Sequence, residues 1–164
     1  TASVSQIAMM LVFLLSVIPI LIWIYRAHAN LAAAGLGGLR HSPGWVVASY
    51  FVPFANFVVP FGAMRELYNR RAGGPEEFGH ISVGVVTSWW ACHVGAVVVW
   101  FIVAASALVD AIPWVYLLTP FWAIYAWTTL MLLLLTGSAW FLVRIVREVT
   151  EAQQSLVNVA ATFD

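Results

Sequence analysis

Three long apolar runs, at residues 7–27, 81–108 and 121–143, constrain this chain more than any other feature. A helix needs about 20 apolar residues to cross the hydrocarbon core of a bilayer, and each run is long enough to do so. Backbone amides in lipid have no water to bind, so such a segment crosses the membrane as a helix. The sequence therefore predicts an all-α, polytopic integral membrane protein with at least three transmembrane helices.

Composition excludes a water-soluble globule and a nucleic-acid-binding protein. Of the 164 residues, 63% are hydrophobic and 9% are charged, whereas a soluble domain carries about 25% charged residues. Seven arginines, with no lysine, are balanced by seven acidic residues, so there is no excess of basic charge to attract nucleic acid. The partners we expect are membrane lipids, and either other membrane subunits or a second copy of the chain.

The segment 43–64 has two possible arrangements in the membrane. It is apolar, but Pro53, Asn56 and Pro60 interrupt it, and each arm beside a turn at 53–56 reaches only about half of the hydrocarbon thickness. A re-entrant hairpin would place all seven arginines on one side, which the positive-inside bias makes cytoplasmic. The alternative is a kinked fourth transmembrane helix, which divides the arginines between the two sides.

The last apolar run continues into a more polar helix. Over residues 144–160, apolar residues recur every three or four positions, which is the period of an amphipathic helix. We expect this helix to lie in the cytoplasm, where its apolar stripe either docks on the protein's own bundle or binds a partner. The whole chain, 1–164, is expected to form a single membrane domain.

Several short motifs resemble a family of bacterial membrane proteins. They are RAHANL at 26–31, SPGW at 42–45, VPFAN at 52–56, PFGAMRELYNR at 60–70 and the WW pair at 89–90. Their order and spacing resemble the family catalogued as domain of unknown function 4328, over residues 23–153. The resemblance implies a polytopic bacterial membrane protein with no established activity, and family members often carry one more apolar helix before the segment that corresponds to 7–27. We therefore expect the protein to lie in the bacterial inner membrane.

A group of polar and charged residues is expected to surround the mouth of the hairpin at the cytoplasmic surface. Arginines at this level can bind anionic lipid headgroups or a phosphorylated ligand. They can equally anchor helix ends and pair with the acidic residue among them, and the sequence leaves both interpretations open. The candidate headgroup-binding residues, here called the arginine collar, are Arg26, Arg40, Arg65, Glu66, Tyr68, Asn69, Arg70 and Arg71.

A second candidate site lies at the middle of the membrane. Asn56, at the tip of the hairpin, and His93, near the centre of the run 81–108, would lie at similar depth, with Ser88 and Cys92 nearby. Polar groups are costly in hydrocarbon and are therefore often functional, so these four residues are a candidate pocket for an ion, a proton or a small molecule. Alternatively, Asn56 caps the turn and His93 is its hydrogen-bond partner.

No catalytic signature accompanies these groups. The sequence has no Ser/His/Asp set, paired carboxylates or phosphate-binding glycine loop, and the histidines do not match in depth as a pair of haem ligands would. Glu76, Glu77 and His80 are interpreted as a solvated turn rather than a metal site. We therefore expect no cofactor and favour a non-enzymatic protein; the alternative, an intramembrane enzyme, would need His93 and Glu66 or Asn56 within hydrogen-bonding reach of a cavity. The expected function is that of an accessory or scaffold subunit of an inner-membrane assembly; the alternative is binding or transport of a lipid or small molecule by the hairpin and its arginine collar.

Overall fold

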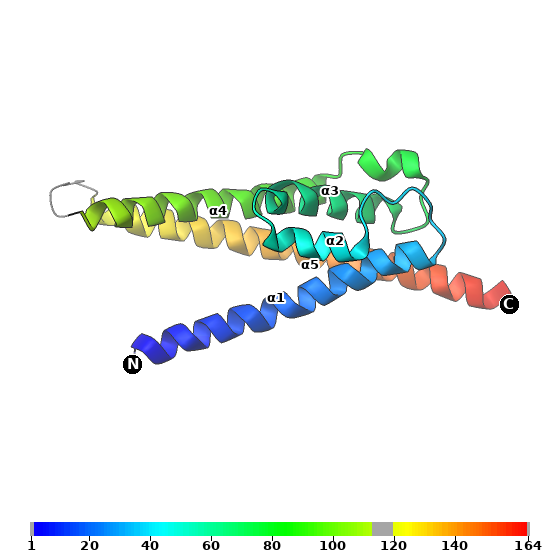
Figure 1. Ribbon diagram of the computed structural model, residues 1–164, viewed down its shortest axis with the longest axis horizontal. Coiled ribbons are helices and arrows are strands. Elements are labelled where there is room, and N and C mark those ends of the chain that lie inside the picture. Colours follow the sequence, from blue (N-terminus) through cyan, green and yellow to red (C-terminus); the bar gives the residue numbers. More distant parts are fainter. Residues whose placement is uncertain (1, 113–119, 164) are drawn as a thin grey trace. The chain divides into compact units, whose positions relative to one another are not determined.

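The computed structural model describes residues 2–112 and 120–163, and among these residues every regular element is a helix (Figure 1). In chain order the elements are α1 (Ala2–Ala33), α2 (Pro43–Ala48), the short 3₁₀-helix η1 (Ser49–Phe51), α3 (Ala55–Arg70), a second 3₁₀-helix η2 (Glu76–His80), α4 (Gly84–Asp110) and α5 (Phe121–Phe163). The all-α prediction is confirmed for this part of the chain. The expected connection between the second and last apolar runs falls largely at 113–119, outside the described residues.

Three helices are long and apolar enough to cross a membrane. α1 runs through Pro19 without a break, in keeping with the tolerance of membrane helices for proline. These helices coincide with the three apolar runs of the sequence, so a membrane protein with three helices of transmembrane length is what the structure supports. The candidate spans are Leu14–Ala33, Glu76–Asp110 and Trp122–Ser155.

Residues 43–64 do not form one continuous helix. α2 begins at Pro43, and Ser42 caps it by accepting a hydrogen bond at Oγ from the Trp45 amide, at 3.3 Å; serine before a proline at the first helical position is a strong start signal. After η1 the chain reverses at Phe54, whose φ of +65° is rare for a residue other than glycine. α3 then runs back in contact with η1 and α2, and the three elements form a helical hairpin.

The chain forms two compact units, one made of Thr1–Ile81 with Val149–Asp164 and the other of Ser82–Glu148. In the first unit, the C-terminal third of α1 packs on the helical hairpin. Close packing of the side chains that are buried at this contact holds the hairpin against α1. The buried side chains of this core include Ile24, Ala27, His28, Leu31, Val46, Ser49, Ala63, Met64 and Leu67.

α5 is a single helix, so the last apolar run and the expected amphipathic segment are continuous. Within the first unit, Val149 is fully buried. Trp23 donates its indole N–H to Thr150 Oγ1 at 3.2 Å, and the Gln153 amide donates to the Ala27 carbonyl at 2.9 Å. This part of α5 therefore docks on the protein's own α1; the side chains beyond residue 155 lie outside the described ones.

In the second unit, two glycines let α4 and the first part of α5 approach closely. A Cβ atom added to Gly95 would lie 3.3 Å from Leu134 Cδ1, and one added to Gly137 would lie 3.3 Å from Cys92 Sγ. Small residues at such a contact allow helix backbones to pack tightly in a membrane. Gly84, at the start of α4, has nothing within 4 Å of the same position.

We predict that Gly137→Leu lowers the thermal stability of the detergent-solubilised protein, because the new side chain must displace Cys92 and separate the two helices. Gly84→Leu is the matched control, since a side chain there enters open space. Melting temperatures of the two variants and the wild type provide the measurement. Equal melting temperatures for all three would show that this glycine contact does not hold the second unit together.

Candidate functional site

The polar side chains at the end of α3 bind the two loops that flank the helical hairpin. Glu66, Asn69 and Arg70 stand three and four positions apart, and so they share one face of the helix. The Asn69 amide donates to the carbonyls of Ile81, at 2.8 Å, and Gly79, at 3.4 Å. One helix face thus holds the segment that leads into α4.

The Glu66 carboxylate holds the other loop, residues 34–42. Its side chain is buried, with 5% of the residue exposed. Oε1 accepts a hydrogen bond from the Arg40 backbone amide at 2.8 Å, and Oε2 lies 3.3 Å from His41 Nδ1. A carboxylate removed from water needs partners of this kind, and here the loop backbone supplies one of them.

Arg70 joins both loops and is itself buried, with 2% exposed. Nη2 donates to the Gly37 carbonyl at 2.8 Å, and Nε donates to the Gly74 carbonyl at 3.3 Å. Nη1 is buried and has no hydrogen-bond partner among the described residues. The guanidinium therefore serves as a structural anchor, with one donor left over.

The other arginines of the arginine collar do not converge on a common ligand position. The Arg65 guanidinium lies 5.3 Å from the centre of the Phe61 ring, and that of Arg71, the residue that caps α3, lies 3.9 Å from the centre of the Tyr68 ring; both are cation–π contacts. Arg26, on α1, is exposed. None of these three arginines lines the pocket described next.

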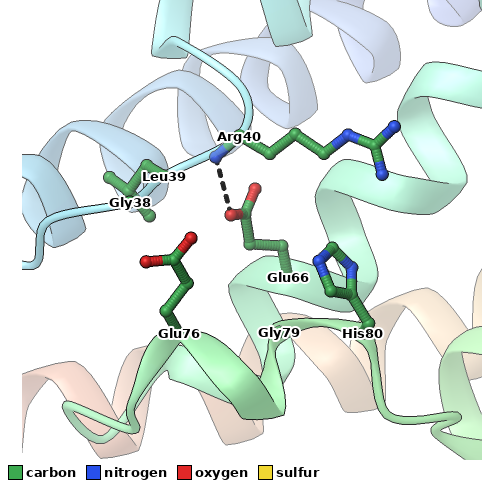
Figure 2. A pocket seen from close by; sticks show the side chains of 7 residues that line it. All are labelled: Gly38, Leu39, Arg40, Glu66, Glu76, Gly79 and His80. Carbon is green, nitrogen blue, oxygen red and sulfur yellow. Dashed lines mark hydrogen bonds between the residues drawn. The ribbon is translucent and has the colours of Figure 1, made fainter.

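A polar pocket of about 380 Å³ lies between the loop before α2, the end of α3, and η2 (Figure 2). Gly38 has a φ of +68°, and a Cβ atom on it would collide with the Glu76 carboxylate. The positive φ favours glycine at this wall. The lining residues are Gly38, Leu39, Arg40, Glu66, Glu76, Gly79 and His80.

Charges of opposite sign stand at different sides of this pocket. Figure 2 shows the carboxylates of Glu66 and Glu76 both directed toward the loop 38–40, whereas the Arg40 side chain extends away from them, toward the side on which His80 stands. The Arg40 guanidinium has no hydrogen bond or ion pair in the described part of the chain, and neither has the Glu76 carboxylate. The pocket can therefore offer a carboxylate pair to a cation and a guanidinium to an anion.

Of the predicted site residues, the pocket contains Arg40 and Glu66, and the anchoring contacts add Asn69 and Arg70. The contribution of Gly38 is not predicted from the sequence, and the segment of Glu76 is predicted only as a solvated turn. The sequence feature that could have indicated the pocket is the pair of glycine-containing loops, 34–42 and 73–81, on either side of the hairpin. A chain that folds back on itself brings these two loops together.

The four residues predicted to form a mid-membrane pocket fall in different units. In the second unit, the His93 ring stacks with the rings of Trp90, at 5.4 Å between centroids, and Trp89, at 6.3 Å. In the first unit, the Asn56 Oδ1 atom is buried and has no hydrogen-bond partner among the described residues. Ser88 is half-buried on α4. The meeting of Asn56 with His93 stays a prediction.

His28 has a structural role that the sequence analysis did not identify. It is buried between α1 and α3, with 1% exposed. Nδ1 lies 2.9 Å from the Ile24 carbonyl oxygen, and Nε2 lies 3.3 Å from that of Ala63. Because a neutral imidazole donates from one nitrogen only, one of these two contacts is a hydrogen bond in that state.

Among the described residues, no three His, Cys, Asp or Glu side chains are placed to hold a metal ion.

Comparison with known proteins places the chain in a family. The model of the family described as "Domain of unknown function (DUF4328)" matches residues 1–151, which is most of the chain, and the protein therefore belongs to this family. The resemblance found in the sequence motifs is confirmed. No curated protein and no solved structure matches the chain.

We predict that Glu66→Ala loosens the loop before α2. The Arg40 amide would lose its buried acceptor, which costs about 1–3 kcal/mol, so its hydrogen exchange should accelerate about tenfold or more. Exchange of peptides covering residues 37–41, followed by mass spectrometry, measures this. Glu77→Ala is the control, because Glu77 is exposed and lies outside the pocket. Unchanged protection in the Glu66 variant would refute the anchoring role.

Proposed function

We propose that this DUF4328 protein is a non-enzymatic, multi-pass protein of the bacterial inner membrane that binds a lipid headgroup or a small polar molecule in the pocket between Arg40, Glu66 and Glu76. The observation that carries the proposal is the pocket itself, an open volume of about 380 Å³ with several charged side chains on its walls. Ligand sites are typically concave and hold a few convergent polar groups of this kind.

The position of the pocket in the chain suits a ligand at the membrane surface. Its walls come from the loop that follows α1, from the end of α3, and from η2, just before α4. The loop after α1 and the η2 segment lie where candidate transmembrane helices end or begin. If α1 and α4 cross the bilayer, the pocket lies at headgroup level, where a polar ligand is accessible without desolvating the charged side chains completely.

We further propose that the helical hairpin is re-entrant, with its mouth and the C-terminal part of α5 in the cytoplasm. Support comes from the tip of the hairpin, where large apolar side chains are exposed: Phe51 to 72%, Phe54 to 85% and Val58 to 70%. The base of the hairpin carries Glu66 and Arg70. An apolar tip and a charged base suit a segment that dips into hydrocarbon and returns to the same surface.

An accessory or scaffold role stays a prediction beside this proposal. Apolar side chains of α1, among them Leu15 and Ile18, are exposed, but such a surface suits lipid chains as well as a partner helix. The exposed surface therefore does not separate the two roles. A polar pocket suits ligand binding and is not needed for a purely structural role, so it favours the ligand-binding proposal. The alternative of an intramembrane enzyme also stays a prediction; the His93 ring stacks on Trp89 and Trp90.

The re-entrant arrangement predicts that positions before and after the hairpin are labelled from the same side of the membrane. In a Cys92→Ser background, we would introduce Gly37→Cys, Ala72→Cys and Asp110→Cys; a side chain on Gly37 meets open space, and Ala72 and Asp110 are exposed. A membrane-impermeant thiol reagent should reach the first two from the cytoplasmic side and the third from the opposite side. Labelling of Gly37→Cys and Ala72→Cys from opposite sides would establish a transmembrane segment instead.

The ligand-binding proposal predicts a bound molecule whose retention depends on the pocket. Native mass spectrometry of the protein released from its own membranes should detect about one tightly held polar lipid or small molecule per chain. His80→Trp, which places a bulky side chain at the pocket wall, should remove it. Phe78→Trp is the matched control, because Phe78 is exposed two positions earlier and does not line the pocket. A wild-type protein that carries no such molecule would contradict the proposal.

A further inference from the structure

We infer that the pocket selects a zwitterion, namely a ligand that carries a protonated amine next to an anionic phosphate, as in a phosphoethanolamine group. This inference rests on the proposed ligand-binding function and adds the chemical class of the ligand. It departs from the sequence-based expectation, in which a ring of arginines would bind an anionic headgroup. The reason is the distribution of charge around the pocket.

The acidic side of the pocket is suited to an ammonium group. Glu66 contributes a buried carboxylate whose oxygens already accept from the Arg40 amide and contact His41, and each carboxylate oxygen can accept a further hydrogen bond. Glu76 lines the same pocket, with its carboxylate directed toward Gly38 (Figure 2), and has no ion pair in the described part of the chain. Two carboxylates in one pocket repel each other, so a protonated amine bound near both relieves the repulsion and provides charge-assisted hydrogen bonds.

The basic side of the pocket is suited to a phosphate. The Arg40 guanidinium extends away from the carboxylates (Figure 2) and has no partner among the described residues. A planar guanidinium recognises phosphate through two parallel hydrogen bonds. A purely anionic ligand would meet the two carboxylates as well, and a purely cationic one would leave Arg40 unused. A zwitterion uses both sides.

Arg70 adds a second, buried positive charge behind the pocket wall. Gly79 belongs to that wall, and a Cβ atom on it would lie 3.8 Å from Arg70 Cδ. The guanidinium forms no ion pair within the described residues, and its Nη1 atom is buried without a hydrogen-bond partner. A buried guanidinium with no carboxylate partner is costly. An anionic group bound in the adjacent pocket would compensate part of its charge.

The test compares lipids that differ in their headgroup. The protein is placed in nanodiscs containing equal amounts of phosphatidylethanolamine and phosphatidylglycerol, and the lipid retained after release is identified by native mass spectrometry. We expect phosphatidylethanolamine to be retained in preference, by about tenfold, which corresponds to one charge-assisted hydrogen bond. Soluble phosphoethanolamine is then added as a competitor. If the pocket recognises the headgroup alone, a low concentration of phosphoethanolamine displaces the bound lipid, which indicates a free zwitterion as the ligand; if the lipid chains also contribute to binding, the lipid is retained.

Four variants separate the two sides of the pocket. Glu76→Gln should abolish the preference for the amine-bearing lipid, because its charge faces the ammonium, and Arg40→Gln should weaken retention of both lipids, because both carry a phosphate. Glu77→Gln and Arg26→Gln are the matched controls, since both residues are exposed and neither lines the pocket. All four substitutions are at exposed residues, so loss of folding is not expected, and circular dichroism verifies this.

Each outcome has a distinct meaning. A preference for phosphatidylethanolamine that depends on Glu76 but not on Glu77 supports the inference for a lipid ligand, and displacement by soluble phosphoethanolamine supports it for a free one. Retention of a molecule with no preference for the amine, or with equal effects of Glu76→Gln and Glu77→Gln, overturns the zwitterion while leaving the proposed function intact. A protein that retains nothing under any of these conditions overturns both.

Discussion

The first unit depends on how the backbone of its two loops finds hydrogen-bond partners. Buried amides and carbonyls must be paired, and short loops between packed helices cannot pair all of their own. α3 supplies the missing partners from one face: Glu66 accepts from the loop before α2, Asn69 donates to the segment before α4, and Arg70 donates to both loops. The walls of the pocket therefore derive their conformation from one helix.

These hydrogen bonds also explain why particular residue types occupy these positions. Arg70 reaches carbonyls in two different loops because a guanidinium carries several N–H groups in a fixed plane, whereas a lysine ammonium is a single point. At the opposite end of the hairpin, Phe51 and Phe54 are exposed, and backbone hydrogen bonds close the turn, among them that from the Asn56 amide to the Val52 carbonyl at 3.1 Å. The hairpin thus has an apolar tip and a polar, internally bonded base, which is the pattern expected where one end meets hydrocarbon and the other meets headgroups.

Much of the helical framework could be predicted from the sequence, since it depends on local features. The length of the apolar runs indicates α1, α4 and α5, and Ser42 followed by Pro43 indicates the start of α2. The pocket could not be predicted, because it depends on contacts between distant residues. The charge of Arg70 does not reveal that its guanidinium donates hydrogen bonds to the carbonyls of Gly37 and Gly74. No local sequence pattern shows that Glu76 lies against Gly38.

The central claim is that α3 holds both loops in place, so that the pocket exists before any ligand binds. The most direct test is the distance between spin labels at Gly37 and Glu77, on the two loops, measured by pulsed electron paramagnetic resonance in nanodiscs with a Cys92→Ser background. The account predicts one narrow distance distribution that is the same with and without an added headgroup. A broad distribution that narrows only when the headgroup is added would contradict it.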